Sequence, residues 1–298
     1  MSNSRFTRRG ALGVMAAAGA AGELAGAVHA QAVRGTFVLI HGTFCGAWIW
    51  RRVADLLQSK GQRVFTVTLT GLGECSHLLS KDINLDTQIT DVVNVVKWED
   101  LRDVCLVAHS FGGWIGSGVL EQIGDRVSSI VWLDAYKPED GQKPLDLTNE
   151  GFRKVVASSL DKGEPSFAPP LRGPIYPIWV NETDADYVIA KLTPQPIGTY
   201  LQPIKLSGAR DKVAKKTYIR AGKFPNPAFD KALAECKADK SWTTLEVDCG
   251  HIVMLDQPDW PMCWCGPLDP ASAKPAAAPV LPPCAQWRWR GIPATAHR

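Results

Sequence analysis

Residues 107–113 read Val107-Ala108-His109-Ser110-Phe111-Gly112-Gly113, and they come directly after an apolar run with the character of a buried strand. A serine at a tight strand-to-helix turn has its hydroxyl lifted clear of the sheet, and small neighbours give the turn the clearance that it needs. Ala108 takes the place where a glycine is usual, and alanine is still small. The segment therefore predicts a nucleophile elbow with Ser110 as the nucleophile, against the alternative of a structural serine in an ordinary turn.

Short apolar runs rich in β-branched residues alternate with helical patterns on both sides of this segment. Such alternation is typical of parallel strands that are joined by helical crossovers. We expect an α/β fold with a doubly wound, mostly parallel sheet. The expected strands span residues 36–40, 64–69, 104–108, 127–133, 217–219 and 243–247, and helical spacing of apolar residues covers 50–60 and 89–96.

The alternation breaks between about residues 138 and 207, where proline, glycine and aromatic residues are dense. Helical segments in this stretch, such as residues 184–192, are short. An insertion between two core strands at their carboxyl side would lie over the crevice in which open parallel sheets bind ligands. We therefore expect a helical cap over the site.

A second segment that carries chemistry is His41-Gly42-Thr43-Phe44-Cys45-Gly46-Ala47-Trp48, directly after the first expected strand. In a fold with a nucleophile elbow, this loop supplies one backbone N–H to an oxyanion hole, and the residue after the nucleophile supplies the other. The expected donors are Thr43 and Phe111. The alternative is an ordinary glycine-containing turn.

A histidine follows the last expected strand in Asp248-Cys249-Gly250-His251. The order serine, acid, histidine is the one that this elbow architecture imposes, and a neutral imidazole at that place can take the proton of the attacking hydroxyl. We therefore expect His251 to be the general base for Ser110.

The acid that would orient His251 has two candidates. Asp134 ends the run Val131-Trp132-Leu133-Asp134, at the carboxyl edge of a strand, and it could equally cap the next turn. The loop after Ile219, where many proteins of this architecture carry an aspartate, has no acid until Asp230, within an expected helix. Asp134 is the first choice and Asp230 the second.

These segments together resemble the α/β-hydrolase superfamily over about residues 36–260. Phe37-Val38-Leu39-Ile40-His41-Gly42 and Gly46-Ala47-Trp48 are most similar to the group of plant methyl-ester esterases and hydroxynitrile lyases. The lyases carry threonine where this chain has Gly42 and lysine where it has Ile252. The resemblance therefore implies a serine esterase without metal or organic cofactor, acting on a small-molecule carboxylic ester through an acyl-enzyme.

Two other functions fit the same residues. Carbon–carbon or carbon–nitrogen bond cleavage, by a lyase or amidase, would use the same triad. A protein that binds a small molecule in the same pocket without turnover would not need the triad. Large aromatic residues, including Trp48, Trp114 and Trp179, suggest an apolar or aromatic ligand, although such residues more often belong to a core.

The ends of the chain differ in composition from its middle. Residues 1–30 carry Arg8-Arg9, a weakly apolar stretch and Val28-His29-Ala30, a pattern that predicts a twin-arginine-like export signal cleaved after Ala30, and hence a periplasmic or secreted protein without a stable membrane anchor. Residues 31–260 would form the catalytic domain, in which residues 256–260 are expected to open a final helix that Pro261 stops. The Pro/Ala-rich residues 261–298 would form a disordered tail.

The charge and the cysteine content limit which partners and which covalent or metal links this chain is expected to have. The net charge of +3 comes from 33 basic and 30 acidic residues without a long basic run, which argues against nucleic acid as a partner. The 8 cysteines lack the paired spacings of a zinc site. Cys236 and Cys249 are candidates for a disulfide in an exported protein. The sequence does not indicate an oligomeric state.

Overall fold

A parallel sheet of six strands forms the centre of the protein. The structure is a computed structural model that describes residues 35–169 and 179–259; the expected export signal and the C-terminal tail lie outside these ranges. The strand order is β2-β1-β3-β4-β7-β8, and all pairings are parallel. The strands are β1 (Thr36–Ile40), β2 (Arg63–Val67), β3 (Val104–His109), β4 (Val127–Leu133), β7 (Lys215–Ala221) and β8 (Trp242–Val247). The predicted fold class is confirmed.

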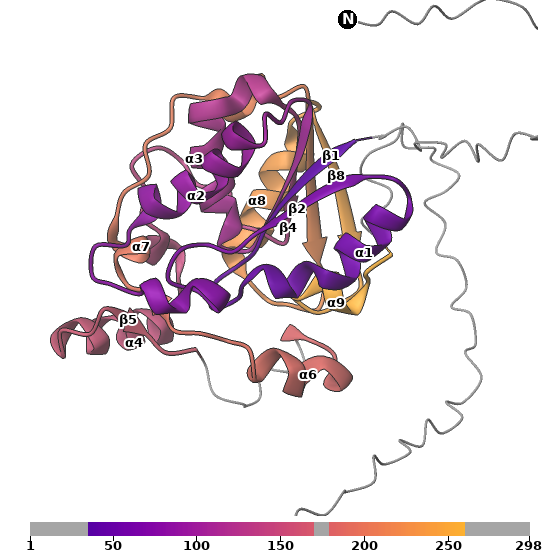
Figure 1. Ribbon diagram of the computed structural model, residues 1–298. Helices are drawn as coiled ribbons and strands as arrows, with labels where there is room; N and C mark the ends of the chain where they lie inside the picture. Colours follow the sequence, from indigo (N-terminus) through magenta and orange to yellow (C-terminus); the bar gives the residue numbers. More distant parts are fainter. Residues whose placement is uncertain (1–34, 170–178, 260–298) are drawn as a thin grey trace, which may run out of the picture. The chain divides into compact units, whose positions relative to one another are not determined.

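Helices cover both faces of this sheet. Figure 1 shows α2 and α3 on one side of the strands and α1 with α9 on the other. The helix α2 begins at a capping box in which Asn84 accepts from the Thr87 amide, a feature that satisfies otherwise unpaired N–H groups. The bounds are α1 (Arg51–Ser59), α2 (Leu85–Trp98), α3 (Gly112–Ile123), α8 (Pro227–Ala238) and α9 (Val253–Asp256), with short 3₁₀ helices η1 (Ala47–Trp50), η2 (Gly73–Leu78), η3 (Gly124–Arg126) and η5 (Ala209–Lys212).

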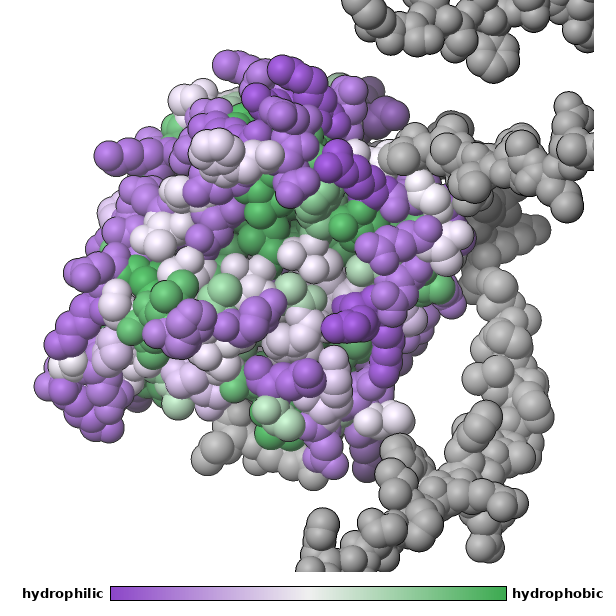
Figure 2. Space-filling view, in the orientation of Figure 1, coloured by the Kyte–Doolittle hydropathy of each residue, from purple (hydrophilic) through white to green (hydrophobic). Residues whose placement is uncertain are grey.

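The core lies along the central strands. Every residue of β3 is buried, as is expected for a strand that is covered on both faces and reads as a continuous apolar run. On the surface shown in Figure 2, hydrophobic residues gather near the centre of the face and hydrophilic residues surround them. The central strands are thus rigid supports for whatever their carboxyl ends carry.

The segment between β4 and β7 is the one that the sequence predicts as a cap. It contains η4 (Pro144–Leu147), α4 (Glu150–Asp161), α6 (Glu182–Ile189) and α7 (Gly198–Leu201). It also contains a small antiparallel pair of β5 (Ser166–Phe167) and β6 (Gln195–Pro196), so the insertion is not purely helical. Figure 1 shows α4, β5 and α6 beyond the carboxyl ends of the central strands.

Side chains fasten this segment to the body of the protein. Arg52 on α1 donates from Nη1 to Asp184 on α6 at 2.7 Å. Asp256 accepts from the Asn181 amide at 3.0 Å with one carboxylate oxygen and from the Gly250 amide at 2.9 Å with the other. One carboxylate thereby links the start of α6 to the loop that carries His251.

The end of the described chain differs from the sequence expectation. A helix was expected to open at Asp256 and run to Trp260, whereas α9 spans Val253–Asp256 and ends where that helix should begin. Gln257 has φ −139° and ψ 63°, outside the helical region. Pro258 explains the difference, because a proline disfavours helical conformation in the residue before it. Trp260 lies outside the described residues.

Candidate active site

Ser110 lies at the bend between β3 and α3 with a left-handed backbone, φ 55°. Few residues other than glycine adopt this conformation, so the bend must be held by its surroundings. The Ser110 amide donates to Leu133 O at 3.3 Å, and Ser110 O accepts from the amides of Gly113 at 3.0 Å and Tyr136 at 3.1 Å. The main chain at the end of β4 therefore fixes the bend and presents the hydroxyl above the sheet.

Two glycines provide the space around this bend. A Cβ atom on Gly42 would lie 2.8 Å from the Cβ and 3.3 Å from the hydroxyl oxygen of Ser110. A Cβ atom on Gly113 would lie 2.0 Å from Tyr136 O. The distances of 2.8 and 2.0 Å are shorter than packed atoms tolerate. The loop of residues 41–48, here called the oxyanion loop, and helix α3 can thus approach the bend at Ser110 this closely only with glycine at these two positions.

His251 reaches Ser110 from the loop after β8. Its Nε2 lies 2.9 Å from the Ser110 hydroxyl oxygen, and its Nδ1 lies 2.6 Å from Asp134 Oδ2. A carboxylate can only accept, so Nδ1 carries the proton and Nε2 is free to accept from Ser110. The structure therefore brings Ser110, His251 and Asp134 together in the order that proton transfer needs.

Aromatic rings and a second histidine hold the imidazole in this orientation. The ring of Phe224 stacks on His251 with centroids 4.3 Å apart, and the ring of His109 lies 4.5 Å away. His109 donates from Nε2 to His251 O at 2.9 Å. Burial, followed by the proximity of His251, lowers the pKa of His109 well below its ordinary value, so this neighbour stays neutral.

Asp134 occupies a fully buried position at the end of β4, also with a left-handed backbone, φ 44°. Its second oxygen, Oδ1, accepts from Arg220 Nη1 at 2.7 Å and from the Ala221 amide at 3.0 Å. Asp134 is thus held as a buried, fully partnered carboxylate that faces His251.

Asp230, the second candidate acid, contacts a different group. It accepts from Arg220 Nε at 2.9 Å, and its side chain is 62% exposed. Arg220 thus lies between the two carboxylates. Burial alone would lower the pKa of Arg220, and the two carboxylates outweigh it and raise the pKa above its ordinary value. The absence of an acid directly after Ile219 is visible in the sequence, but the pairing of Arg220 with Asp134 is not.

The loop expected to form the oxyanion hole lies directly against Ser110. His41, which is fully buried, donates from Nδ1 to Gly42 O at 2.8 Å and accepts from the Leu69 amide at 3.1 Å. Burial lowers the pKa of His41 to about 4 and keeps it neutral. Because a trans peptide points its C=O and N–H in opposite directions, this bond directs the Thr43 N–H away from His41. Neither the Thr43 nor the Phe111 amide donates a hydrogen bond to any residue that the structure describes.

One residue of the cap contacts both expected donors. The Tyr200 hydroxyl lies 2.7 Å from Thr43 Oγ1, and the Tyr200 ring stacks on Phe111 with centroids 5.1 Å apart. Burial raises the pKa of Tyr200 well above its ordinary value, so the hydroxyl stays protonated. The sequence does not indicate this role of Tyr200, because the cap has no periodicity from which facing residues can be inferred.

The three tryptophans considered as ligand contacts have different surroundings. Trp114 is fully buried on α3 and packs against Tyr136, so it belongs to the core. Trp179 is 8% exposed, and its ring lies parallel to that of His251 at 6.5 Å. Trp48 packs against Tyr187 on the cap helix α6. Of these three tryptophans, Trp179 is the one whose ring stacks on His251.

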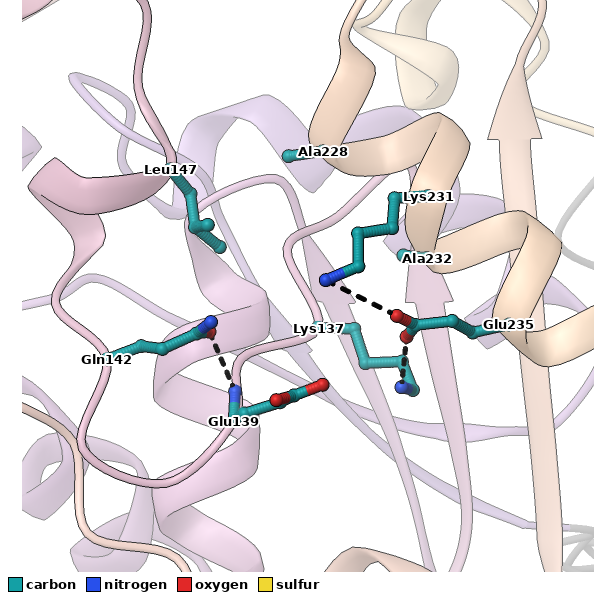
Figure 3. A pocket seen from close by; sticks show the side chains of 8 residues that line it. All are labelled: Lys137, Glu139, Gln142, Leu147, Ala228, Lys231, Ala232 and Glu235. Carbon is teal, nitrogen blue, oxygen red and sulfur yellow. Dashed lines mark hydrogen bonds and ion pairs between the residues drawn. The ribbon is translucent and has the colours of Figure 1, made fainter.

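A hollow outside this site is shown in Figure 3. It lies between the chain after β4 and helix α8, and Lys137 and Lys231 both pair with Glu235 there. The two lysines of its lining thus share one carboxylate, that of Glu235. Across residues 35–169 and 179–259, no cluster of histidine, cysteine and acidic side chains is arranged to hold a metal ion. In the same ranges, no helix is long and apolar enough to cross a membrane.

No disulfide bond joins any of the cysteines within residues 35–169 and 179–259. Cys236 and Cys249, the candidates for a disulfide, are both buried and unpaired with one another. Burial raises the pKa of each to about 12. A thiol of this kind is a poor nucleophile at neutral pH.

Known proteins resemble this chain over nearly all of its described length. Residues 37–260 match the model of the Alpha/beta hydrolase family. The Carbendazim hydrolyzing esterase of Nocardioides sp. (strain SG-4G) is 32% identical over 232 residues, which cover 75% of this chain and 95% of that protein. Polyneuridine aldehyde esterase of Rauvolfia serpentina is 28% identical over 245 residues, 74% of this chain and 90% of that protein. An extracellular alpha/beta-hydrolase from a Paenibacillus species has the same fold, with a TM-score of 0.68 at 24% identity over 78% of this chain and 99% of that one.

Proposed function

Because the chain belongs to the alpha/beta hydrolase family, we propose that it is a serine esterase that cleaves a small carboxylic ester through an acyl-enzyme. The observation that carries the proposal is the pair of contacts made by His251, 2.9 Å to Ser110 and 2.6 Å to Asp134. Esterases among the relatives support the same reaction class.

The reaction would proceed in two halves. Ser110 Oγ attacks the ester carbonyl while His251 Nε2 takes its proton, and the N–H groups of Thr43 and Phe111 hold the oxyanion. His251 then gives the proton to the departing alcohol, which leaves an acyl group on Ser110. Water, deprotonated by His251, attacks this acyl group and releases the acid.

Asp134 and Arg220 would act on the base rather than on the substrate. Asp134 keeps the proton on Nδ1 and stabilises the imidazolium that forms during attack. The Asp134 carboxylate is fully buried, and the positive charge of Arg220 offsets the free-energy cost of removing that carboxylate from water. In this scheme Asp230 anchors Arg220 and takes no part in proton transfer.

Two positions favour ester hydrolysis over cyanohydrin cleavage. Ile252, which is 1% exposed, follows His251 where the lyases carry a lysine, so no cation is supplied for a leaving cyanide. Gly42 lies against Ser110 where the lyases carry a threonine, and a side chain there would lie within 3.3 Å of the nucleophile.

The surroundings of the site suit an apolar substrate group. Phe111 and Tyr200 adjoin the oxyanion loop, and Trp179 and Phe224 adjoin His251. Aromatic walls bind apolar or aromatic groups with a large buried area. We therefore include carbendazim, named for one relative, among the candidate substrates together with methyl esters of aromatic acids.

The test combines labelling with an ester panel. The purified mature protein is treated with a fluorophosphonate probe, and hydrolysis is measured for esters varied separately in the acyl and the alcohol part. We expect labelling on Ser110 and hydrolysis, both abolished in Ser110→Ala. A protein that neither reacts with the probe nor turns over any ester would overturn the proposal, and cleavage of cyanohydrins or amides in its place would reassign the reaction.

We also propose that the chain is exported. The support is the Arg8-Arg9 pair followed by an apolar stretch that ends at Ala30. Fractionation of cells that express the full chain should find a form beginning at Gln31 outside the cytoplasm. Replacement of both arginines by lysine should leave the longer form inside, and export of that variant at the parental level would contradict the proposal.

A further inference from the structure

Phe44 has an unusual backbone for its residue type. Its φ is 66°, in the left-handed region that bulky side chains rarely enter. Such a conformation costs free energy and persists only where the surroundings enforce it. Phe44 follows Thr43, whose amide is proposed for the oxyanion hole, so whatever holds Phe44 also shapes that loop.

Both peptide groups of Phe44 are held by the cap. The Phe44 amide donates to Gln195 Oε1 at 3.1 Å, and Phe44 O accepts from the Thr193 amide at 2.9 Å. Gln195 is fully buried, and its Nε2 donates to Thr199 Oγ1 at 3.0 Å. Its amide is therefore fixed in the orientation that presents oxygen to Phe44.

The Phe44 ring is anchored in the same part of the protein. It is 4% exposed and packs edge-on against Phe167 of β5, with centroids 5.5 Å apart. Phe152 of α4 lies at 6.5 Å. These contacts set the position of the side chain, whereas the hydrogen bonds to Gln195 and Thr193 set the orientation of the backbone.

The Gly42–Thr43 peptide is thus fixed from two sides. His41 holds Gly42 O on the side of the sheet, and the clamp on Phe44 fixes the chain immediately after Thr43. We propose that Gln195 is a positioning residue for the oxyanion hole: by holding the Phe44 amide, it keeps the left-handed turn that places the Thr43 N–H. The proposal rests on the proposed esterase function and adds to it a residue of the cap.

The test compares two glutamines of the same cap. Gln195→Met removes the acceptor at similar side-chain volume. Gln202→Met is the matched control, because Gln202 also ties the cap to the body, through Asp86, but does not contact the oxyanion loop. The measurements are kcat and KM for the best ester, the inhibition constant of a trifluoromethyl ketone that adds to Ser110, and thermal unfolding.

Gln195→Met should lower kcat by about 10- to 100-fold and weaken the ketone by a similar factor, with KM changed less than about threefold, since an oxyanion donor acts on the transition state. Gln202→Met should stay within about twofold of the parent in all three constants. Should Gln195→Met fold poorly, Thr199→Val, which frees the Gln195 amide to rotate, should lower kcat in the same direction.

Equal kcat and ketone affinity in Gln195→Met and Gln202→Met would overturn the positioning role, and so would a change confined to KM. Labelling of the parent by the fluorophosphonate probe separates this result from a failure of the esterase proposal. A parent that is neither labelled nor active has no oxyanion hole to position and overturns both.

Discussion

Ser110 and Phe44 belong to two different parts of the candidate site, the sheet edge and the loop after β1, and both have left-handed backbones, with φ of 55° and 66°. The bend at Ser110 is held by main-chain bonds to Leu133 and Tyr136, at the end of the neighbouring strand. The turn at Phe44 is held on its amide side by the side chain of Gln195 and on its carbonyl side by the Thr193 amide, both from the cap.

The difference lies in what each half of the site depends on. Backbone bonds at a strand end persist through most substitutions, so the half with Ser110 and Asp134 is a property of the sheet. A bond to one side chain is lost when that side chain changes. The half with Thr43 and Phe44 should therefore respond to changes in the cap, and the sheet half should respond only to changes in its reacting groups or its glycines.

The largest effect is expected from Asp134→Asn in the sheet half. An asparagine cannot keep the proton on His251 Nδ1, so kcat should fall by about 10⁴-fold while the fold persists. Asp230→Asn is the control, because Asp230 contacts Arg220 and not His251, and it should lower kcat less than about tenfold. If the two variants lose kcat to a similar extent, Asp134 is not the acid that orients His251.

A glycine of the same half should be nearly as sensitive in stability. Gly113→Ala places a methyl group 2.0 Å from Tyr136 O and should lower the free energy of unfolding by about 4 kcal/mol. Gly124→Ala meets nothing within 4 Å at a φ of −55° and should be neutral or slightly stabilising. Urea denaturation measures both, and equal stabilities would mean that α3 can shift away from β4.

His41, which supports the oxyanion loop, should make stability depend on pH. Its pKa is lowered from 6.5 to about 4, so the unfolded chain binds a proton in this window and the folded chain does not. The free energy of unfolding should therefore fall as the pH drops from about 6.5 to 4, by about 3 kcal/mol on account of this residue.

The variant His41→Asn keeps a donor for Gly42 O and removes the titrating group. It should be less stable than the parent at pH 7 but lose less stability on acidification, whereas His77→Asn, at an exposed histidine, should keep the parental slope. If the free energy of unfolding of His41→Asn depends on pH as steeply as that of the parent, the acid sensitivity arises from other groups.

The smallest effect concerns two tyrosine hydroxyls, one in each half. Tyr200→Phe removes the contact with Thr43, and Tyr218→Phe removes the bond to Ala135 O. Each should lower the free energy of unfolding by about 1 kcal/mol. Only Tyr200→Phe should also lower kcat, by about threefold, because only its partner lies in the cap-dependent half. A larger kcat loss in Tyr218→Phe would reverse the comparison.

The sheet half could be predicted from the sequence because its signals are local. Strands 36–40 and 127–133 coincide with β1 and β4, and the residues expected at the carboxyl ends of β3, β4 and β8 meet in the structure. The choice between Asp134 and Asp230 stayed open because it depends on the buried Arg220, whose pairing no spacing indicates. The helix expected from Asp256 is wrong at Gln257, because Pro258 disfavours the helical conformation in the residue before it.

The cap half could not be predicted in the same way. Gln195 and Tyr200 belong to β6 and α7, elements of 2 and 4 residues that leave no periodic pattern in the sequence. Their partners at Thr43 and Phe44 are separated from them by more than a hundred residues of chain, and the contacts arise only when the insertion folds over the sheet.

The carboxylate of Asp256 has a practical meaning for anyone who recombines such enzymes. One of its oxygens belongs to the cap through Asn181 and the other to the histidine loop through Gly250. A chimera that imports a foreign insertion without an equivalent of Asn181 would remove the two hydrogen bonds that this oxygen accepts, next to the loop that carries His251. The insertion between β4 and β7 and the loop that carries His251 should therefore be exchanged together.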